Sequence, residues 1–170
     1  MVKLSPCPNC HEEIYSDSDF CPHCGVLFEK TEKQHCERHS SERAIGICII
    51  CRSLRCIACL KRVGGKFLCE DHAEVEVQED WACVFESTDI NEAELIHAVL
   101  KENTVNVLGQ NFNSVGFVWD GGGDSSISRS NLSKAAKVFV PIPEFERAKT
   151  LVEDWIRGGE EFQANESQHP

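Results

Sequence analysis

Eight cysteine and histidine residues between positions 36 and 72 form four pairs, and in every pair two residues separate the two potential ligands. The pairs are Cys36/His39, Cys48/Cys51, Cys56/Cys59 and Cys69/His72. Structural zinc sites take four thiolate or imidazole ligands, and one tight turn can supply two of them at this spacing. The segment therefore predicts two tetrahedral metal sites. Disulfides are the alternative for the six cysteines, but two histidines at ligand spacing favour metal.

The order of the pairs along the chain permits two arrangements of these sites. Sequential pairing would give two independent loops. Interleaving joins the first pair to the third and the second to the fourth, and it encloses a single apolar core between the ions. The predicted members of that core are Ile45, Ile47, Ile49, Leu54, Ile57, Leu60 and Leu68. We favour interleaving because it creates one core.

Residues 36–72 also resemble a B-box zinc finger, a family with two zinc ions in an interleaved, cross-braced arrangement. The resemblance implies that Cys36, His39, Cys56 and Cys59 hold one ion, and that Cys48, Cys51, Cys69 and His72 hold the other. B-box fingers commonly end in two histidines, whereas this segment ends in Cys69 and His72. RING domains share the cross-brace but place their histidine in the middle pairs, which disfavours a ubiquitin-ligase function. His35 is an alternative ligand, but the spacing favours His39.

A further group of four cysteines precedes these pairs, in two turns of the form Cys-x-x-Cys. Its members are Cys7, Cys10, Cys21 and Cys24. The group predicts a zinc ribbon over residues 1–28, in which Gly25 supplies the positive φ that closes the second turn. His11 stands at the equivalent position of the first turn, where it causes strain or adopts a left-handed conformation at some cost. The segment resembles the short zinc ribbons at the start of many prokaryotic proteins.

The three sites together predict three zinc ions per chain. Iron, as in rubredoxin-like centres, is the alternative in the four-cysteine site. We interpret His11 and His23 as surface residues rather than ligands.

The charge of the chain argues against nucleic acid as a partner. The formal net charge is -11, and ten thiolates with three divalent ions would bring it to about -15. The basic residues of the central segment, interpreted as a solvated surface around anionic sites, are Arg52, Arg55, Lys61, Arg62 and Lys66. No apolar run approaches the roughly 20 residues of a membrane span, and Met1 to Pro6 lacks the apolar stretch of a signal peptide. We therefore expect a cytoplasmic protein, whose reducing compartment keeps thiols available for zinc.

The second half of the chain contains only one cysteine, Cys83, and predicts an α+β domain over residues 80–158. The predicted strands are Trp81–Glu86, Thr104–Leu108, Val115–Trp119 and Lys137–Val140. One helix follows Asp89, which caps it with Glu92 three residues on. Another begins near Pro143 and ends at Gly158-Gly159, so residues 159–170 are expected to be a disordered tail.

This half resembles a small prokaryotic signal-transducing domain of ferredoxin-like fold, related to the PII regulators. The resemblance rests on Asn91-Glu92-Ala93-Glu94-Leu95-Ile96, on Val140-Pro141 and on Glu146-Arg147-Ala148. It implies the fold, but no effector-binding residues of PII proteins are matched. Gly121-Gly122-Gly123 lacks the lysine and helix start of a phosphate loop, and we interpret it as a flexible loop.

The predicted organisation is thus multi-domain: two small zinc-stabilised modules, then a ferredoxin-like α+β domain. A charged linker, Glu29 to Gln34, is expected to let the zinc modules move as independent beads. Cys83 is expected to be a buried inert thiol, and no catalytic constellation is evident. We predict a non-enzymatic adaptor or regulatory protein that binds a protein partner. The alternatives are a nucleic-acid-binding ribbon and a redox or zinc-sensing switch.

Overall fold

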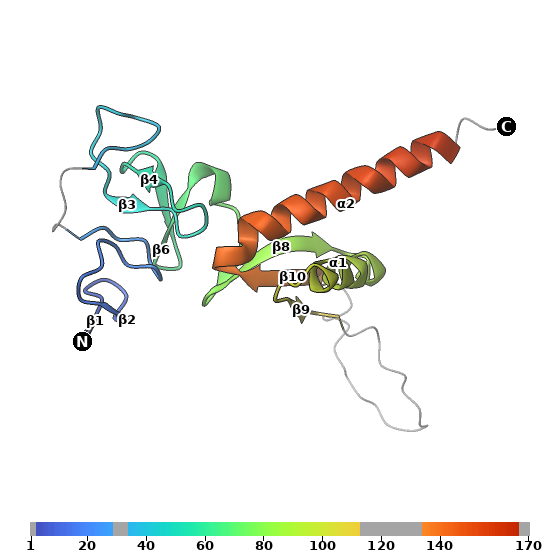
Figure 1. Cartoon of the computed structure of the whole chain (residues 1–170), viewed down its shortest axis with the longest axis horizontal. Coiled ribbons are helices and arrows are strands. Elements are labelled where there is room, and N and C mark those ends of the chain that lie inside the picture. Colours follow the sequence, from blue (N-terminus) through green and yellow to red (C-terminus); the bar gives the residue numbers. More distant parts are fainter. Residues whose placement is uncertain (1–2, 29–33, 113–133, 167–170) are drawn as a thin grey trace, which may run out of the picture. The chain divides into compact units, whose positions relative to one another are not determined.

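A computed structural model describes residues 3–28, 34–112 and 134–166 of the chain, with side chains as far as residue 158. It is a mixed α/β structure that divides into two compact units, Met1–Asp80 and Trp81–Pro170. Each unit is described by itself (Figure 1). Among the described residues, no helix has both the length and the apolar character needed to cross a bilayer.

Short antiparallel strand pairs make up most of the regular structure in the first unit. The pairs are β1 (Leu4–Pro6) with β2 (Glu13–Tyr15), β3 (Gly46–Ile47) with β4 (Leu54–Arg55), and β5 (Leu60–Val63) with β6 (Lys66–Cys69). A turn of 3-10 helix, η1 (Glu70–His72), and the short strand β7 (Val77–Gln78) follow. Such short strands bury little apolar surface, so another interaction must stabilise this unit.

Three of the cysteine turns have the same backbone geometry. In each, the residue after the second cysteine donates its N–H to the carbonyl of the first cysteine at 2.9 Å. These donors are His11, Gly25 and Arg52, and their φ angles are 66°, 82° and 60°. His11 therefore adopts the left-handed conformation at the position where glycine is usual. A non-glycine residue there costs roughly 1–2 kcal/mol.

The ribbon packs against the central segment through backbone hydrogen bonds. Ile47 donates its N–H to the Gly25 carbonyl at 2.8 Å, and Phe67 donates to the Cys24 carbonyl at 2.9 Å. The expectation that the two zinc modules move as independent beads is therefore wrong. The residues that make this contact lie in the second cysteine turn of the ribbon. The prediction was based on the charged composition of the linker, which does not reveal that contact.

Glycines permit this close approach of two backbones. A Cβ at Gly25 would lie 2.3 Å from the Ile47 carbonyl oxygen, and a Cβ at Gly46 would lie 2.7 Å from the Phe67 ring. Val26 and Gly46 also form an isolated antiparallel bridge. The two glycines thus lie at the contact between the ribbon and the central segment.

Basic side chains of the central segment extend this contact. Arg62 donates to the Asn9 side-chain oxygen at 2.8 Å, and Lys66 donates to the His23 carbonyl at 3.2 Å. The Arg52 guanidinium lies 5.9 Å from the centre of the Phe20 ring, a distance suited to a cation–π contact. Arg52 and Arg62 are exposed and Lys66 is half-buried, so the interpretation of a solvated surface holds for the first two, which also contact the ribbon. Their partners lie in another part of the sequence, so spacing alone could not identify them.

The apolar core between the two central ligand groups is smaller than predicted. Ile47, Ile49 and Leu68 are buried, whereas Ile57 is 78% exposed and Ile45 is 38% exposed. Ile57 lies between Cys56 and Cys59, in a turn whose two intervening residues both face solvent. The prediction placed Ile57 in the core because its side chain is apolar, and this assignment is wrong.

The second unit is a sheet with two helices packed on it. Its elements are β8 (Trp81–Ser87), α1 (Ile90–Glu102), β9 (Leu108–Gln110), β10 (Ala136–Pro141), η3 (Ile142–Glu144) and α2 (Phe145–Glu166). The strands lie in the order β8, β10, β9, and β10 is antiparallel to both neighbours. Both helices contact the sheet and each other.

The core of this unit comes from one stripe on each helix and from β10. Helical spacing predicts a buried stripe of Ala93, Ile96, Val99 and Leu100 in α1, and all but the half-buried Val99 are buried. The corresponding predicted stripe of α2 is Phe145, Ala148, Val152, Trp155 and Ile156. Its first three members are buried, whereas Trp155 is half-buried and Ile156 is 39% exposed. Cys83 is only half-buried, so the expectation of a buried thiol is not met.

The start of α1 uses one more residue than the predicted capping box. The Asp89 carboxylate accepts a hydrogen bond from the Asn91 N–H at 2.8 Å. The Ser87 hydroxyl accepts from the Asp89 N–H at 3.0 Å and donates to the Glu92 carboxylate at 2.6 Å. Ser87 thus connects the two residues that a capping box would join directly.

Two element boundaries differ from their prediction. The strand expected over 104–108 begins at Leu108, because the N–H groups of Thr104 and Val105 bond back to carbonyls of α1. Helix α2 continues through Gly158-Gly159 to Glu166, so the predicted helix end is wrong, and so is the disordered tail over residues 159–166; residues 167–170 lie outside the described part of the chain. Glycine lowers helix stability but keeps its N–H, and it does not have to end a helix. The strand expected over 115–119 lies outside the described residues.

Gly25 and His11 provide a matched test of the left-handed position. We expect Gly25→Ala to destabilise the zinc-loaded first unit by at least about 2 kcal/mol, because it adds both backbone strain and a clash with the Ile47 carbonyl. His11→Gly removes strain at an exposed position and is expected to raise stability by up to about 1 kcal/mol. Urea unfolding, monitored through the amide signals of residues 3–78, measures the stability of both variants. Equal stability of the two variants would contradict this account of the contact.

Candidate metal centres

Twelve cysteine and histidine side chains meet in three groups of four. The groups are Cys7, Cys10, Cys21 and Cys24; Cys36, His39, Cys56 and Cys59; and Cys48, Cys51, Cys69 and His72. Within each group the ligand atoms all lie within 4.8 Å of one another. We call them the ribbon site, the first central site and the second central site. They contain the twelve residues that the spacing predicts as ligands.

The distances within the groups suit a tetrahedral metal ion. Zinc–sulfur bonds of about 2.3 Å place two sulfurs of a tetrahedron roughly 3.8 Å apart. The Cys7–Cys24 and Cys10–Cys21 sulfur pairs are separated by 3.9 and 3.6 Å. Disulfide sulfurs lie at about 2.05 Å, and all eleven cysteines are free thiols. The alternative of a disulfide framework is therefore not what the structure shows.

The ribbon site is formed by two turns that face each other. Three of its cysteines are buried, and Ile14 packs against them. Burial alone would raise the pKa of the Cys7 thiol, but hydrogen bonds from the backbone N–H groups of Cys10 and Asn9 lower it to about 7. Backbone donors aimed at the sulfur favour the thiolate, which is the form that binds metal.

The two central sites are interleaved. Cys36 and His39 precede β3 and meet Cys56 and Cys59, which lie between β4 and β5. The His39 Nδ1 atom lies 3.5 and 3.2 Å from the two sulfurs of that second pair. The structure thus groups the first ligand pair with the third, which is the interleaved arrangement that the argument from a single core favours. Sequential pairing would have grouped the first ligand pair with the second.

The second central site is the more buried of the two. Cys48 and Cys51 follow β3, Cys69 ends β6, and His72 lies in η1. The His72 ring is buried, and its Nδ1 lies 3.7 Å from Cys48 and 3.2 Å from Cys69. The hairpin of β5 and β6 thus carries one pair of the first central site at its start and one cysteine of the second at its end.

The remaining histidines of the first unit lie outside the groups. His39, and not His35, lies in the first central group; the backbone of His35 forms an isolated bridge with Arg43. The His23 ring lies 3.4 Å from the Asp80 carboxylate. His11 is exposed. These positions agree with the interpretation of His11 and His23 as surface residues.

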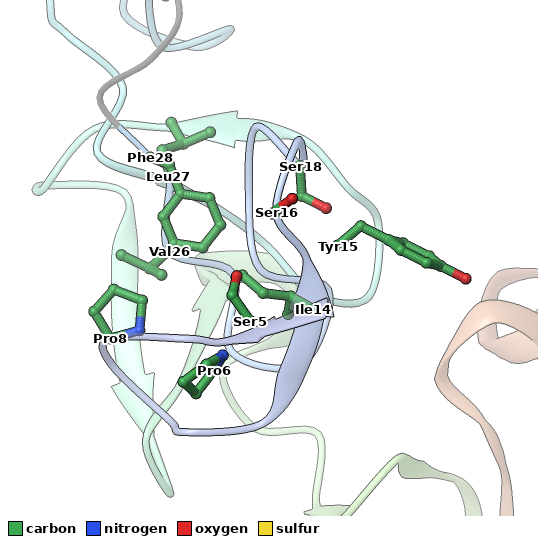
Figure 2. A pocket seen from close by; sticks show the side chains of 10 residues that line it. All are labelled: Ser5, Pro6, Pro8, Ile14, Tyr15, Ser16, Ser18, Val26, Leu27 and Phe28. Atoms are coloured by element: carbon green, nitrogen blue, oxygen red, sulfur yellow. The ribbon is translucent and has the colours of Figure 1, made fainter. Parts of the chain in front are cut away.

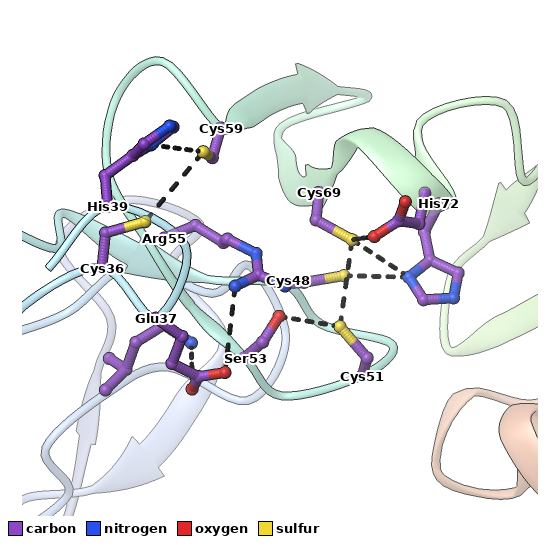
Figure 3. Close-up of polar contacts among 12 residues, drawn as sticks. Cys36, Glu37, His39, Cys48, Cys51, Ser53, Arg55, Cys59, Cys69 and His72 are labelled. Atoms are coloured by element: carbon purple, nitrogen blue, oxygen red, sulfur yellow. Dashed lines mark hydrogen bonds and ion pairs between the residues drawn. The ribbon is translucent and has the colours of Figure 1, made fainter.

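A side chain that the sequence analysis treated as surface lies between the two central sites. Arg55 is only 15% exposed, and its guanidinium lies 3.8 Å from the Glu37 carboxylate (Figure 3). Burial opposes its charge, but the thiolates of Cys69 and Cys51 raise the pKa of Arg55. A fixed positive charge next to anionic thiolate sites reduces their mutual repulsion. In the sequence, the feature that could have indicated this role of Arg55 is its position in the short loop between the second and third ligand pairs.

Ser53 is a second contributor that spacing did not identify. Its side chain is buried, and its hydroxyl lies 2.9 Å from the Cys51 sulfur. Hydrogen bonds from the Cys48 thiol and from this hydroxyl lower the pKa of Cys51 to about 4, while the same coupling raises the pKa of Cys48. Ser53 thus favours the thiolate form of one ligand.

The donor sets fit zinc. Thiolate and imidazole ligands, four per group, are the composition of structural zinc sites, which leave no coordination position for a substrate. The structure thus contains three Cys/His sites compatible with metal ions. Comparisons with protein-family models, with curated proteins and with solved structures found no match.

The number of ions and the pairing are tested by mass and by double substitution. We expect native mass spectrometry of protein purified without chelator to show three zinc ions. Cys36→Ser with Cys56→Ser removes ligands from one interleaved site and is expected to cost one ion in total. Cys36→Ser with Cys48→Ser removes ligands from both central sites and is expected to cost two. The reverse pattern would support sequential pairing.

Chelation tests what stabilises each unit. Zinc binding in finger peptides is worth roughly 10–16 kcal/mol, more than the small cores of the first unit provide. A strong chelator is therefore expected to collapse the amide dispersion of residues 3–78 while the signals of Trp81 to Ile156 stay near their positions. Collapse of both sets would contradict separate stabilisation of the two units.

Proposed function

We propose that this chain is a non-enzymatic, zinc-binding adaptor or regulatory protein that acts by binding a protein partner. The observation that carries the proposal is the closure of the three sites. Each group provides four ligands, of which three are buried; the fourth is half-buried in the ribbon site and the second central site, and it is the exposed His39 in the first central site. A catalytic zinc site keeps one position open for water or substrate, so ions held here serve structure.

Resemblances to known modules support this proposal. Residues 1–28 resemble zinc ribbons and residues 36–72 resemble B-box fingers, two classes that use zinc to present a surface. The interleaved grouping of the central ligands is the arrangement that the B-box resemblance implies. In the second unit, β10 lies between β8 and β9, an order compatible with a ferredoxin-like signal-transducing domain over residues 80–158.

Two further features bear on the partner and the compartment. Arg52, Arg62 and Lys66 each contact the ribbon, which gives these basic side chains a role within the first unit. The net charge of -11 also opposes binding to nucleic acid. Eleven free cysteines suit a reducing compartment, and we therefore place the protein in the cytoplasm.

The proposal is tested by binding measurements on the full zinc-loaded chain. We expect affinity capture from cells of the native organism to retain a protein partner reproducibly, and to lose it when chelator removes the zinc. Fluorescence anisotropy with single- and double-stranded DNA and RNA probes at low salt is expected to show no binding. Binding that falls steeply with salt would instead support the nucleic-acid alternative. Reversible zinc release by mild oxidation, accompanied by gain or loss of the partner, would support the switch.

A further inference from the structure

The first central site is the least enclosed of the three ligand groups. Its histidine ligand, His39, is exposed. The histidine of the second central site, His72, is only 5% exposed. The most exposed ligand of the ribbon site, like that of the second central site, is a half-buried cysteine. Solvent therefore reaches a whole ligand side chain in the first central site.

The residues between paired ligands differ in the same way. In the first central site, the four residues inside the two ligand turns are all exposed: Glu37, Arg38, Ile57 and Ala58. In the second central site, Ile49 and Ile50 occupy the turn between Cys48 and Cys51, and they are 0% and 4% exposed. Buried aliphatic residues thus lie inside one turn of the second central site, whereas both turns of the first central site face water.

Apolar side chains also cover the ribbon site. Ile14 is buried in one cluster with three of its cysteines, and Val26 and Phe28 pack against that cluster. Figure 2 shows these three side chains together in the lining of a surface pocket on the ribbon. The corresponding buried cluster at the first central site consists of Cys36, Cys56 and Cys59. An apolar shell limits the access of solvent to a metal site, so the first central site is the one that incoming ligands reach most easily.

The His39 ring has little support from the protein apart from the ligand group. Its Nδ1 atom lies 3.5 and 3.2 Å from the sulfurs of Cys56 and Cys59. Within the described residues, these are the polar contacts of the ring. A metal-bound histidine usually donates its second N–H to a carboxylate, a carbonyl or water, and loss of such a partner typically lowers metal affinity ten- to hundredfold. At His39 that partner is water, so the bond from this ligand to the metal is easier to break.

The turn around His39 is fixed by contacts that do not involve its ring. Cys36 donates its N–H to the Glu42 carbonyl at 2.9 Å. The Glu37 carboxylate accepts a hydrogen bond from the Leu54 N–H at 2.9 Å, and Arg38 forms an ion pair with Glu70. The imidazole can therefore rotate into solvent while the backbone keeps Cys36 in its place. Three thiolates then remain around the metal.

We propose that the first central site exchanges its zinc with the surroundings through the position of His39, whereas the ribbon site and the second central site retain theirs. In this step the bond from His39 to the metal breaks, a bond from an incoming solvent ligand forms, and no electrons are transferred. The inference goes beyond the proposed adaptor function and does not depend on it. It makes occupancy of one site follow the zinc available around the protein.

Isotope exchange on the full zinc-loaded chain tests the proposal. Protein loaded with zinc of natural composition is mixed with an excess of a salt of a heavier zinc isotope, and native mass spectrometry follows the mass of the bound ions. We expect one ion to exchange at least about tenfold faster than the other two. Three ions that exchange at one common rate would refute the inference.

Thiol labelling identifies the site that releases its ion first. A limiting amount of chelator is added to the parent protein together with N-ethylmaleimide, and the labelled cysteines are located by peptide mapping. We expect Cys36, Cys56 and Cys59 to be labelled first, because free thiolates react and metal-bound ones are protected. Earlier labelling of the ribbon cysteines or of Cys48 would overturn the assignment.

A pair of matched ligand substitutions tests entry at His39. His39→Cys replaces an unsupported imidazole by a thiolate, and it is expected to slow the fast ion by about tenfold or more. His72→Cys makes the same change in the second central site and is expected to leave the fast rate within about twofold of the parent. If His39→Cys exchanges as fast as the parent, or if His72→Cys alone slows the fast ion, the route through His39 is wrong. No partner is used in these measurements, so their failure leaves the adaptor proposal standing.

Discussion

The convergence of thiolates and imidazoles at three points replaces the ordinary hydrophobic core in the first unit. One of its buried clusters consists of Cys36, Cys56 and Cys59 alone. Sulfur ligands can bury themselves around an ion with little help from aliphatic side chains, whereas bare thiolates would repel one another at the same distances. The short strands, the turns and their hydrogen bonds are arranged around these ligands, and they have no comparable apolar layer of their own.

The contact between the ribbon and the central segment gives this unit a second level of organisation. Phe67 N–H bonds to the carbonyl of the ligand Cys24, and Ile47 N–H bonds to the carbonyl of the next residue. Phe67 is two positions from Cys69, and Ile47 directly precedes Cys48. The ribbon site and the second central site are therefore joined through a few backbone bonds. The two modules therefore belong to one structural unit.

The sequence predicted the ligand groups well because their spacing is a local property. A turn of four residues fixes which side chains face one ion, whatever the rest of the chain does. Helix α1 was predicted for a similar reason, since Ala93, Ile96 and Leu100 repeat with helical spacing. Its cap was also local, although Ser87 joins Asp89 to Glu92 in a way that the capping-box pattern does not contain.

The predictions that failed concern properties that spacing does not encode. Packing of the ribbon depends on a backbone approach at Gly25 that only the folded chain reveals. Ile57 has the composition of a core residue but lies at the tip of a ligand turn. The glycines at 158 and 159 lower helix propensity without ending α2. Arg55 was grouped with surface charges, although its side chain is only 15% exposed and the thiolates of Cys69 and Cys51 raise its pKa.

The interleaved order of the ligands has a consequence for the growing chain during synthesis. The ribbon has all its ligands once Cys24 has emerged, whereas the first central site waits for Cys59 and the second for His72. The ribbon can therefore load its ion while the surface on which it packs, at Ile47 and Phe67, is still being made. Until then the turn around Gly25 is held by the metal and by hydrogen bonds within the ribbon, such as the one from Gly25 N–H to the Cys21 carbonyl. The short stretch from Cys59 to His72, which contains the β5–β6 hairpin, completes both central sites and supplies Phe67, which bonds to the ribbon.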